Sequence, residues 1–225
     1  IALVNTVYLP PQVSSKFFEV DPYAFNSLTD FISLSEVKIS KNLRLDALFA
    51  LECISLKHVW CSDIMRNLGG NMSHGLLFQI LRYLSKILRE KSSEVDEIYN
   101  VRFFYLISNL ADVKVLHEAL LAAGLIPALL DIVSIKNLNY RRTLASATHL
   151  LEVFINDSDS TNEFINNDGF TTLIKSIDEE INYAIENKGQ FNPPEFIKVY
   201  YAISFRQLSY IRSHLKLVIK LLKTD

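Results

Sequence analysis

The chain has 225 residues, of which 49% are hydrophobic and 21% charged, and its formal net charge is -2. This composition is ordinary for a globular protein and excludes a disordered or collagen-like chain, while the small net charge argues against wholesale binding to nucleic acid or membranes. No apolar run reaches the roughly 20 residues that a membrane-spanning helix needs. We therefore expect no membrane partner, no direct nucleic-acid binding, and a location in the nucleus and cytoplasm.

Nearly every segment of the chain has the apolar periodicity of a helix, and almost none alternates as a strand does. An N-terminal extension and a first helix are predicted over residues 1–39, the helix beginning at Asp21-Pro22 and running to about Ser33. Helical repeats are predicted over 40–190, and further helices over 191–225 are expected to continue them.

The first helices of the repeat region have recognisable ends. Ser40 is predicted to cap a helix with a shared face of Leu43, Ala47, Leu48 and Leu51. A short helix over about 58–68 is expected to end at Gly69-Gly70, because glycine tolerates the left-handed conformation that stops a helix. Ser73 is predicted to cap the next helix, whose apolar residues follow three- and four-residue spacing: Leu76, Leu77, Ile80, Leu81, Leu84, Ile87 and Leu88.

Further helices are predicted along the rest of the repeat region, over about 94–110, 113–123, 125–133, 140–155 and 171–187. Pro127 falls in the first turn of one of them, where proline is tolerated. The stretch "NKGQFNPP" is the clearest loop, and residues 195–223 are expected to form one or two helices. The chain is therefore predicted to be all-α.

Three glycines recur at a nearly constant interval. Gly75, Gly124 and Gly169 each follow an apolar helix and a turn, and each begins another apolar helix, at intervals of 124 - 75 = 49 and 169 - 124 = 45 residues. Recurrence at about 40 to 50 residues in a helical chain is typical of armadillo or HEAT repeats, whose units bury their faces only by stacking. The predicted fold class is an all-α, armadillo/HEAT-like helical-repeat solenoid.

The glycines also invite a phosphate-binding interpretation, which the sequence disfavours. Gly70 and Gly75 have the spacing of a Walker loop, but Leu76 stands in the place of the required lysine and no strand precedes the loop. We therefore expect no nucleotide or other cofactor.

No metal or catalytic site is predicted either. Cys53, His58, Cys61 and His74 lie near one another in the sequence, but they lack the closely spaced ligand pairs of a structural zinc site. Both cysteines fall in apolar helical pattern and are interpreted as small buried hydrophobic residues in a reducing compartment. The remaining histidines are interpreted as packing or surface residues: His117, His149 and His214.

Two charged faces are candidates for partner binding. The first comprises Asp178, Glu179, Glu180 and Glu186, most of which fall away from an apolar stripe formed by Leu173, Ile174, Ile177, Ile181 and Ala184. The second comprises Arg212, Lys216, Lys220 and Lys223, beside an apolar side formed by Leu208, Ile211, Leu215, Val218 and Leu222. Solvated helix flanks are the default interpretation of both. The functional interpretation of the acidic face is contact with a basic client, and that of the basic stripe is contact with phosphate or an acidic partner.

Four stretches in this order resemble the N-terminal helical region of the giant HECT-type E3 ubiquitin ligases, the Huwe/Mule/Tom class: "ALFALECISLKH", "NMSHGLLFQILRYL", "AGLIPALLDIV" and "FINNDGFTTLIKSIDEEINYAI". In that family, a pair of domains of unknown function carries an S/N-H-G-hydrophobic segment, then G-L-I-P-x-L-L, then F-x-x-x-x-G-hydrophobic followed by an acidic helix. These segments match residues 73–77, 124–130 and 164–185. The final "RSHLKLVIKLLK" is similar to the basic apolar helix that follows in the family.

The resemblance implies an armadillo-like solenoid within a much larger ligase chain, where it helps to present substrates to a C-terminal HECT domain. The partners it implies are protein clients, including basic nucleic-acid-binding proteins, the rest of the ligase chain, and a ubiquitin-loaded E2 bound through the HECT domain outside this segment. Neither Cys53 nor Cys61 lies in a sequence like the family's catalytic cysteine loop, so no catalytic residue is carried over. The parent protein is expected to be an enzyme and this segment to be non-catalytic.

The alternative is a free-standing armadillo adaptor with no enzymatic activity. Such an adaptor requires a complete short chain with polar capping repeats at both ends. Here the chain begins at Ile1 rather than methionine, and its last predicted helix is still apolar at Leu222. These features favour the interpretation as a fragment of a longer chain.

Overall fold

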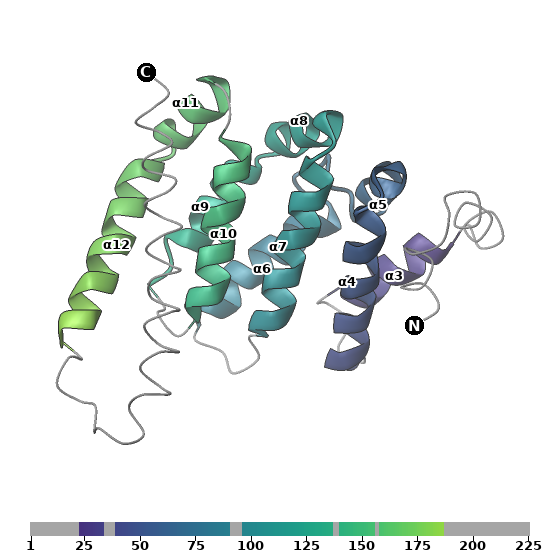
Figure 1. Cartoon of the computed structure of the whole chain (residues 1–225), viewed down its shortest axis with the longest axis horizontal. Helices are drawn as coiled ribbons and strands as arrows, with labels where there is room; N and C mark the ends of the chain where they lie inside the picture. Colours follow the sequence, from purple (N-terminus) through teal and green to yellow (C-terminus); the bar gives the residue numbers. More distant parts are fainter. Residues whose placement is uncertain (1–22, 34–38, 91–95, 137–139, 156–157, 187–225) are drawn as a thin grey trace. The chain divides into compact units, whose positions relative to one another are not determined.

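The computed structural model describes residues 23–33, 39–90, 96–136, 140–155 and 158–186, with side chains up to Glu179 in the last range (Figure 1). Within these ranges the chain forms ten α-helices, one short 3₁₀ helix and no strand. The predicted all-α, helical-repeat fold class is thereby confirmed. The predicted helix start at Asp21-Pro22, the loop from Asn187 and the helices over 195–223 lie outside the described residues.

The chain divides into two compact units. Unit 1 comprises residues 1–83 and 98–125, and unit 2 comprises residues 84–97 and 126–225. The helices in unit 1 are α3 Ala24–Ile32, α4 Lys41–Ser55, η1 His58–Trp60, α5 Cys61–Leu68 and α8 Lys114–Ala122. Those in unit 2 are α10 Arg141–Phe154, α11 Ser158–Asn166 and α12 Gly169–Glu186. Three helices contribute residues to both units: α6 Leu76–Arg89, α7 Glu97–Ala111 and α9 Leu125–Val133.

Along the chain, the helices repeat in a regular order. A short helix, a glycine and a second helix occur three times, as α5 and α6 at Gly75, α8 and α9 at Gly124, and α11 and α12 at Gly169. After the first two of these pairs comes a third helix, α7 or α10. The three glycines therefore stand at the turns between helices, as predicted from their spacing. The predicted domain limits at residues 39/40 and 190/191 stay predictions.

The helix ends in unit 1 are set by local chemistry, mostly as predicted. The Ser40 hydroxyl accepts a hydrogen bond from the Leu43 amide at 3.2 Å and caps α4. Gly69 ends α5 in the left-handed conformation, with φ 57° and ψ 34°. The prediction that Ser73 caps α6 was wrong, because the first helical bond runs from the Gln79 amide to the Gly75 carbonyl, which places the cap at Gly75.

Gly75 is required by a close approach between two turns. A Cβ atom at this position would lie 2.0 Å from the Gly69 carbonyl oxygen, which is backbone and has no rotamer through which to move. The Ser73 carbonyl instead accepts a hydrogen bond from Arg82 Nη1 at 2.7 Å, which ties the turn to the second half of α6. The glycine therefore allows α5 and α6 to follow each other closely.

The core of each unit is formed by the apolar stripes of its helices. In α6, the predicted stripe is confirmed, since six of its seven residues are buried and Leu76 is half-buried. In α4, Ala47, Leu48 and Leu51 are buried as predicted. Leu43 is 43% exposed instead, because the first three residues of α4 all lie at the surface.

One helix of unit 2 was missed by the sequence analysis. Helix α11 has the sequence "SDSTNEFIN", and of its residues only Ser160 and Phe164 are buried. A segment this polar has no apolar periodicity from which a helix could be predicted. Its helical structure is stabilised by packing between the two apolar helices on either side of it in the chain. Helix α12 begins at Gly169, two residues before its predicted start, directly after Asp168 in the left-handed conformation.

Candidate protein-interaction surfaces

The acidic face predicted on α12 is only partly described. Asp178 is exposed, whereas Glu179 is half-buried and pairs with Lys136, which follows α9. Glu180 and Glu186 lie on the backbone of α12, but their side chains are outside the described residues. Since Lys136 already balances one carboxylate, the acidic face presents less negative charge to a partner than its sequence indicates.

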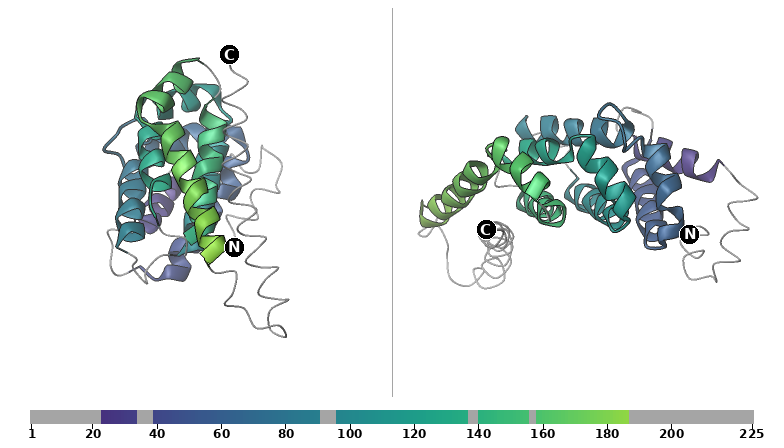
Figure 2. Two further views of the ribbon diagram at one scale, coloured as in Figure 1. Left: turned by 90° about the vertical axis from the view of Figure 1, so that its left-hand side faces the viewer. Right: turned by 90° about the horizontal axis from the view of Figure 1, so that it is seen from above.

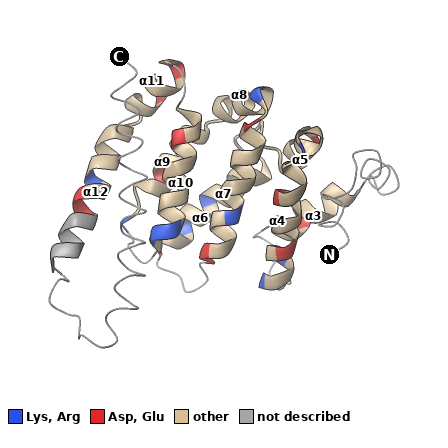
Figure 3. Ribbon diagram, in the orientation of Figure 1, with Lys and Arg blue, Asp and Glu red and all other residues tan. Residues whose placement is uncertain are grey.

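The basic stripe falls beyond α12, outside the described residues: Arg212, Lys216, Lys220 and Lys223. Its role in partner binding stays a prediction. Along the ribbon of the described helices, Lys and Arg residues are interspersed with Asp and Glu residues (Figure 3).

The apolar stripe of α12 differs from its prediction. Leu173 is buried and Ile177 half-buried, as expected, but Ile174 is 45% exposed. Ser176 is buried in its place, and its hydroxyl donates a hydrogen bond to the Val133 carbonyl at 3.3 Å. The side of α12 that packs in unit 2 is therefore centred between Leu173 and Ser176, next to the end of α9.

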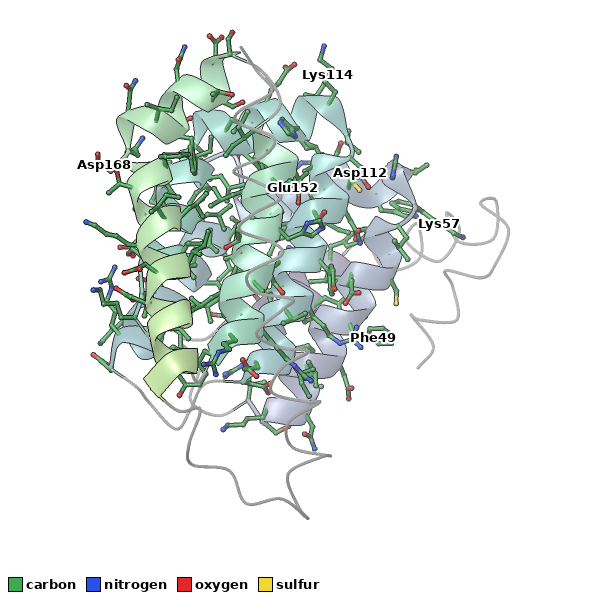
Figure 4. All side chains as sticks on the ribbon, turned by 60° about the vertical axis from the view of Figure 1, so that its left-hand side comes forward. Phe49, Lys57, Asp112, Lys114, Glu152 and Asp168 are labelled. Carbon is green, nitrogen blue, oxygen red and sulfur yellow. The ribbon has the colours of Figure 1, made fainter. Side chains whose placement is uncertain are left out.

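The corner that positions α12 is a tight one. A Cβ atom on Gly169 would lie 2.5 Å from the buried Phe164 ring, so the start of α12 must approach α11 closely. Asp168, labelled in Figure 4, precedes it with φ 56°. Its carbonyl accepts a hydrogen bond from the Thr172 amide at 2.9 Å. The corner orients the exposed Phe170 as well as the buried Leu173.

In unit 1, helices α4 and α7 lie side by side (Figure 1 and Figure 2). They share a partly buried ion pair. Arg102 Nη1 donates to Glu52 Oε2 at 2.8 Å, and the guanidinium lies 4.3 Å from the centroid of the Phe49 ring. These side chains are 33% and 19% exposed for Arg102 and Glu52, so the pair is less screened than a surface salt bridge. We name Phe49, Glu52, Ser55, Arg102 and Asn109 the α4–α7 seam.

The other end of the seam is held by an amide and a hydroxyl. Asn109 Nδ2 donates to the Ser55 hydroxyl at 2.9 Å and to the Glu52 carbonyl at 3.3 Å. The Cys61 thiol donates to the Ser55 carbonyl at 3.2 Å. Sequence reasoning did not find the seam, although Ser55 and Asn109 are polar residues within apolar helices, a pattern that signals buried hydrogen bonding.

A second polar cluster, in unit 2, also went unpredicted. The Ser85 hydroxyl and the Arg89 guanidinium both donate to the Asp131 carboxylate, which links α6 to α9. Arg89 Nη2 also donates to the Asp131 carbonyl at 3.2 Å. Because 42 to 46 residues separate the partners, no local pattern predicts this cluster. The Arg89 and Asp131 side chains are about half exposed, whereas Ser85 is buried, so the cluster lies at the edge of the contact between the two helices.

The two thiols are poorly suited to nucleophilic catalysis. Cys61 is buried, and its burial together with the nearby Asp112 carboxylate raises its pKa to about 11. Burial also raises the pKa of Cys53, and Glu52 adds to the increase. A catalytic thiol needs the opposite environment, because the thiolate is the nucleophile. Both cysteines were predicted to be buried, which is confirmed for Cys61, while Cys53 is half-buried.

Within the described ranges, no group of three or more His, Cys, Asp or Glu side chains lies close enough to hold a metal ion. Of the histidines, His58, His74 and His149 are exposed, and His149 Nδ1 lies 3.3 Å from Glu152 Oε2 on α10. Among the same residues, no single helix is long and apolar enough to cross a membrane.

These observations define a class of protein. In the part of the chain that the structure describes, helical repeats bury apolar faces and polar clusters join neighbouring helices. The class that these features define is the all-α helical-repeat protein.

Comparison with known proteins makes this class more specific. Residues 1–86 match a family described as "Domain of Unknown Function (DUF908)". Over its full length, the chain is 72% identical to the E3 ubiquitin-protein ligase TOM1 of Saccharomyces cerevisiae and 70% identical to a probable E3 ubiquitin-protein ligase TOM1 of Eremothecium gossypii. It is 22% identical to the E3 ubiquitin-protein ligase ptr1 of Schizosaccharomyces pombe.

The chain spans 7% of the length of each of these relatives. The matched part of the first relative is its N-terminal region. The resemblance drawn from the four sequence stretches is therefore confirmed: from end to end, the chain is similar to the N-terminal segment of a giant E3 ubiquitin-protein ligase.

Proposed function

We propose that the chain is a non-catalytic, helical-repeat scaffold within a giant HECT-type E3 ubiquitin ligase, and that it presents substrates to a HECT domain elsewhere in the same polypeptide. The observation that carries this proposal is the 72% identity over the whole chain to a segment that makes up 7% of such a ligase. Identity at this level over 225 residues supports the same fold and the same place in the parent protein.

The environment of the thiols supports the non-catalytic part of the proposal. A HECT domain accepts ubiquitin on an activated cysteine, which must be deprotonated and accessible. Cys61 is buried with a raised pKa, and its thiol donates to the Ser55 and Asn109 carbonyls. We propose that a ubiquitin-loaded E2 meets the ligase through the HECT domain, outside this segment.

The clients that we propose for this surface are basic, nucleic-acid-binding proteins of the nucleus and cytoplasm. The acids of α12 provide the complementary charge, with Asp178 exposed at the surface of unit 2. In the complete ligase, reversing charge with Asp178→Lys and Glu186→Lys is expected to weaken binding of a basic client about tenfold, as measured by fluorescence anisotropy. Lys114→Glu in unit 1 adds negative charge at another exposed site and is the matched control. Unchanged client binding in the double variant would refute this client surface.

The size of the native polypeptide tests whether this chain is part of a much larger ligase. Peptides from this chain should be found by mass spectrometry in a denaturing-gel band of several hundred kilodaltons, together with peptides of a HECT domain. A band near the 25.7 kDa mass of the chain would instead establish the free-standing adaptor.

A further inference from the structure

The α4–α7 seam of unit 1 is bordered by apolar residues that are only partly buried. On α4, Phe49 and Cys53 are half-buried and Leu56 is 61% exposed. On α7, Ile98 and Tyr105 are 57% and 50% exposed. Single exposed apolar residues need no explanation, but a contiguous group of them marks an interaction site. We name these five residues the α4–α7 surface.

The five residues form two neighbouring rows. At about 100° per residue, the three residues of α4 fall within about 60° of one another on the helical wheel, and the two of α7 within about 20°. The Arg102 guanidinium lies over the Phe49 ring and pairs with Glu52, so it joins the row on α4 to the row on α7. The two rows are therefore parts of one surface.

The two helices run in the same direction. Arg102 on α7 contacts Phe49 and Glu52 on α4. Asn109, two turns further along α7, contacts Ser55, which is also further along α4. The rows therefore lie side by side from one end of the seam to the other, which gives the surface the elongated form that an extended peptide needs.

Two carboxylates stand at opposite ends of the surface. Asp46 precedes Phe49 by one turn and Asp112 follows Arg102 by nearly three turns, so about 20 Å separates the two acids along the helix axes. Both residues are exposed, and neither forms an ion pair with another described residue. Arg102, the cation between them, is already neutralised by Glu52. The charge left unbalanced on this surface is therefore negative.

The surface also offers hydrogen-bonding groups for a peptide main chain. The Asn109 amide nitrogen donates within the seam, and its carbonyl oxygen has no partner among the described residues. The Tyr105 hydroxyl has none among them either. Groups of this kind can pair with the N–H and C=O groups of an extended segment, which need partners when the segment is bound.

We propose that the α4–α7 surface binds an extended segment of another protein, in which a large apolar side chain lies between two Lys or Arg residues. The apolar side chain contacts Phe49 and Tyr105, and the cations meet Asp46 and Asp112. Because an extended chain rises about 3.3 Å per residue, cations about six residues apart span the two acids. A second copy of this chain fits poorly, since a two-fold interface would set these carboxylates against each other.

The test is fluorescence anisotropy with a labelled peptide and the complete polypeptide that contains this chain. The probe consists of serine and glycine, with a central tryptophan and a lysine three residues to each side of it. A second probe has glutamate in place of both lysines. We expect the lysine peptide to bind saturably and the glutamate peptide to bind at least about tenfold more weakly. Equal binding of the two peptides, or no saturable binding of the lysine peptide, would overturn the proposal.

A pair of matched variants locates the bound peptide. Tyr105→Ser removes the exposed aromatic ring from the surface, and Val115→Ser, at a 71% exposed residue of α8, is its control. We expect Tyr105→Ser to raise the Kd at least about fivefold and Val115→Ser to change it by less than about twofold. Since both residues are at least half exposed, neither substitution should unfold the chain. Equal effects of the two substitutions on the Kd would overturn the proposal.

Charge variants separate this surface from the client surface on α12. Asp46→Asn combined with Asp112→Asn should raise the Kd about tenfold, whereas Asp178→Lys combined with Glu186→Lys should change it by less than about twofold. Loss of binding in the α12 variant alone would place the peptide on α12 and overturn the proposal. The inference rests on unit 1, so it stands or fails independently of the ligase function and of the client surface on α12.

Discussion

The α4–α7 seam of unit 1 and helix α12 of unit 2 show two outcomes of the same helical-repeat design. In the seam, each polar group has a partner on the facing helix, as with Arg102 and Glu52 or Asn109 and Ser55. Along α12, one side is packed through Leu173 and Ser176, while Phe170 and Ile174 stay exposed. The difference shows that glycine turns and apolar stripes build the repeat in both units, whereas the share of a helix face that is packed differs from one helix to another.

The largest expected effect is a loss of unfolding free energy on substituting the glycine of a turn, and its size should differ between the two turns. Gly75→Ala would place a Cβ atom 2.0 Å from a backbone carbonyl oxygen, and we expect it to lower the free energy of unfolding by about 3 kcal/mol or more. Gly169→Ala meets the Phe164 ring instead, whose side chain can shift, so a loss of about 1 to 2 kcal/mol is expected. Urea unfolding of both variants measures the difference. Equal losses of unfolding free energy in the two variants would contradict this difference, because they would show that both turns tolerate a Cβ atom equally well.

The next effect concerns the seam itself. Arg102→Met removes the charge and leaves Glu52 half-buried without its ion pair, so we expect a loss of about 1 to 2 kcal/mol in unfolding free energy. Lys114→Met breaks an exposed i,i+4 pair with Glu118 and serves as the control, with about 0.5 kcal/mol or less expected. A seam variant no less stable than its control would contradict the role of the ion pair.

A pH dependence of about 1 kcal/mol is expected from Cys61, which lies against the seam. Its pKa in the folded chain is raised to about 11 from the ordinary thiol value of 9.0, so the unfolded chain loses the thiol proton first as the pH rises. Stability from this group is therefore complete below about pH 9 and falls between about pH 9 and 11. Urea unfolding at pH 8 and pH 10 measures the change, and Cys61→Ala should be less sensitive to pH. If both chains respond to pH identically, Cys61 does not contribute.

The smallest effect is expected in unit 2, at the pair of Lys136 with Glu179. Lys136 is 76% exposed, so a double-mutant cycle with Lys136→Ala and Glu179→Ala should give a coupling of about 0.5 kcal/mol or less. The same cycle on Arg102 and Glu52 should give a larger coupling, because those side chains are more buried. Similar coupling energies in the two cycles would contradict the expectation that the ion pair of the seam is stronger than the ion pair on α12.

The sequence predicted those features that depend on neighbours along the chain. Apolar spacing placed α6, α8 and α9, the Ser40 side chain identified the start of α4, and Gly69 identified the end of α5. Each of these signals is local, because a helix face or cap is determined within one or two turns. The recurrence of glycine then indicated the repeat.

The features that the sequence did not reveal depend on residues far apart. The seam joins Glu52 to Arg102 across 50 residues, and Asp131 bonds to Ser85 across 46. Helix α11 has too few apolar residues to be recognised from the sequence. Ile174 was predicted in the packed stripe of α12 but is exposed, because periodicity gives the width of an apolar arc and not which part of the arc is packed. Of the candidate partner-binding residues, only Asp178 and Glu179 have described side chains, and client binding by these residues stays a prediction.

The central claim, a scaffold that presents clients without taking part in catalysis, is tested most directly in the complete ligase lacking residues 40–186. Two quantities should be measured side by side: formation of the HECT–ubiquitin thioester from loaded E2, and ubiquitination of a basic client. We predict thioester formation within about twofold of the intact ligase and client ubiquitination reduced about tenfold or more. Loss of the thioester would contradict the account, and so would undiminished client ubiquitination.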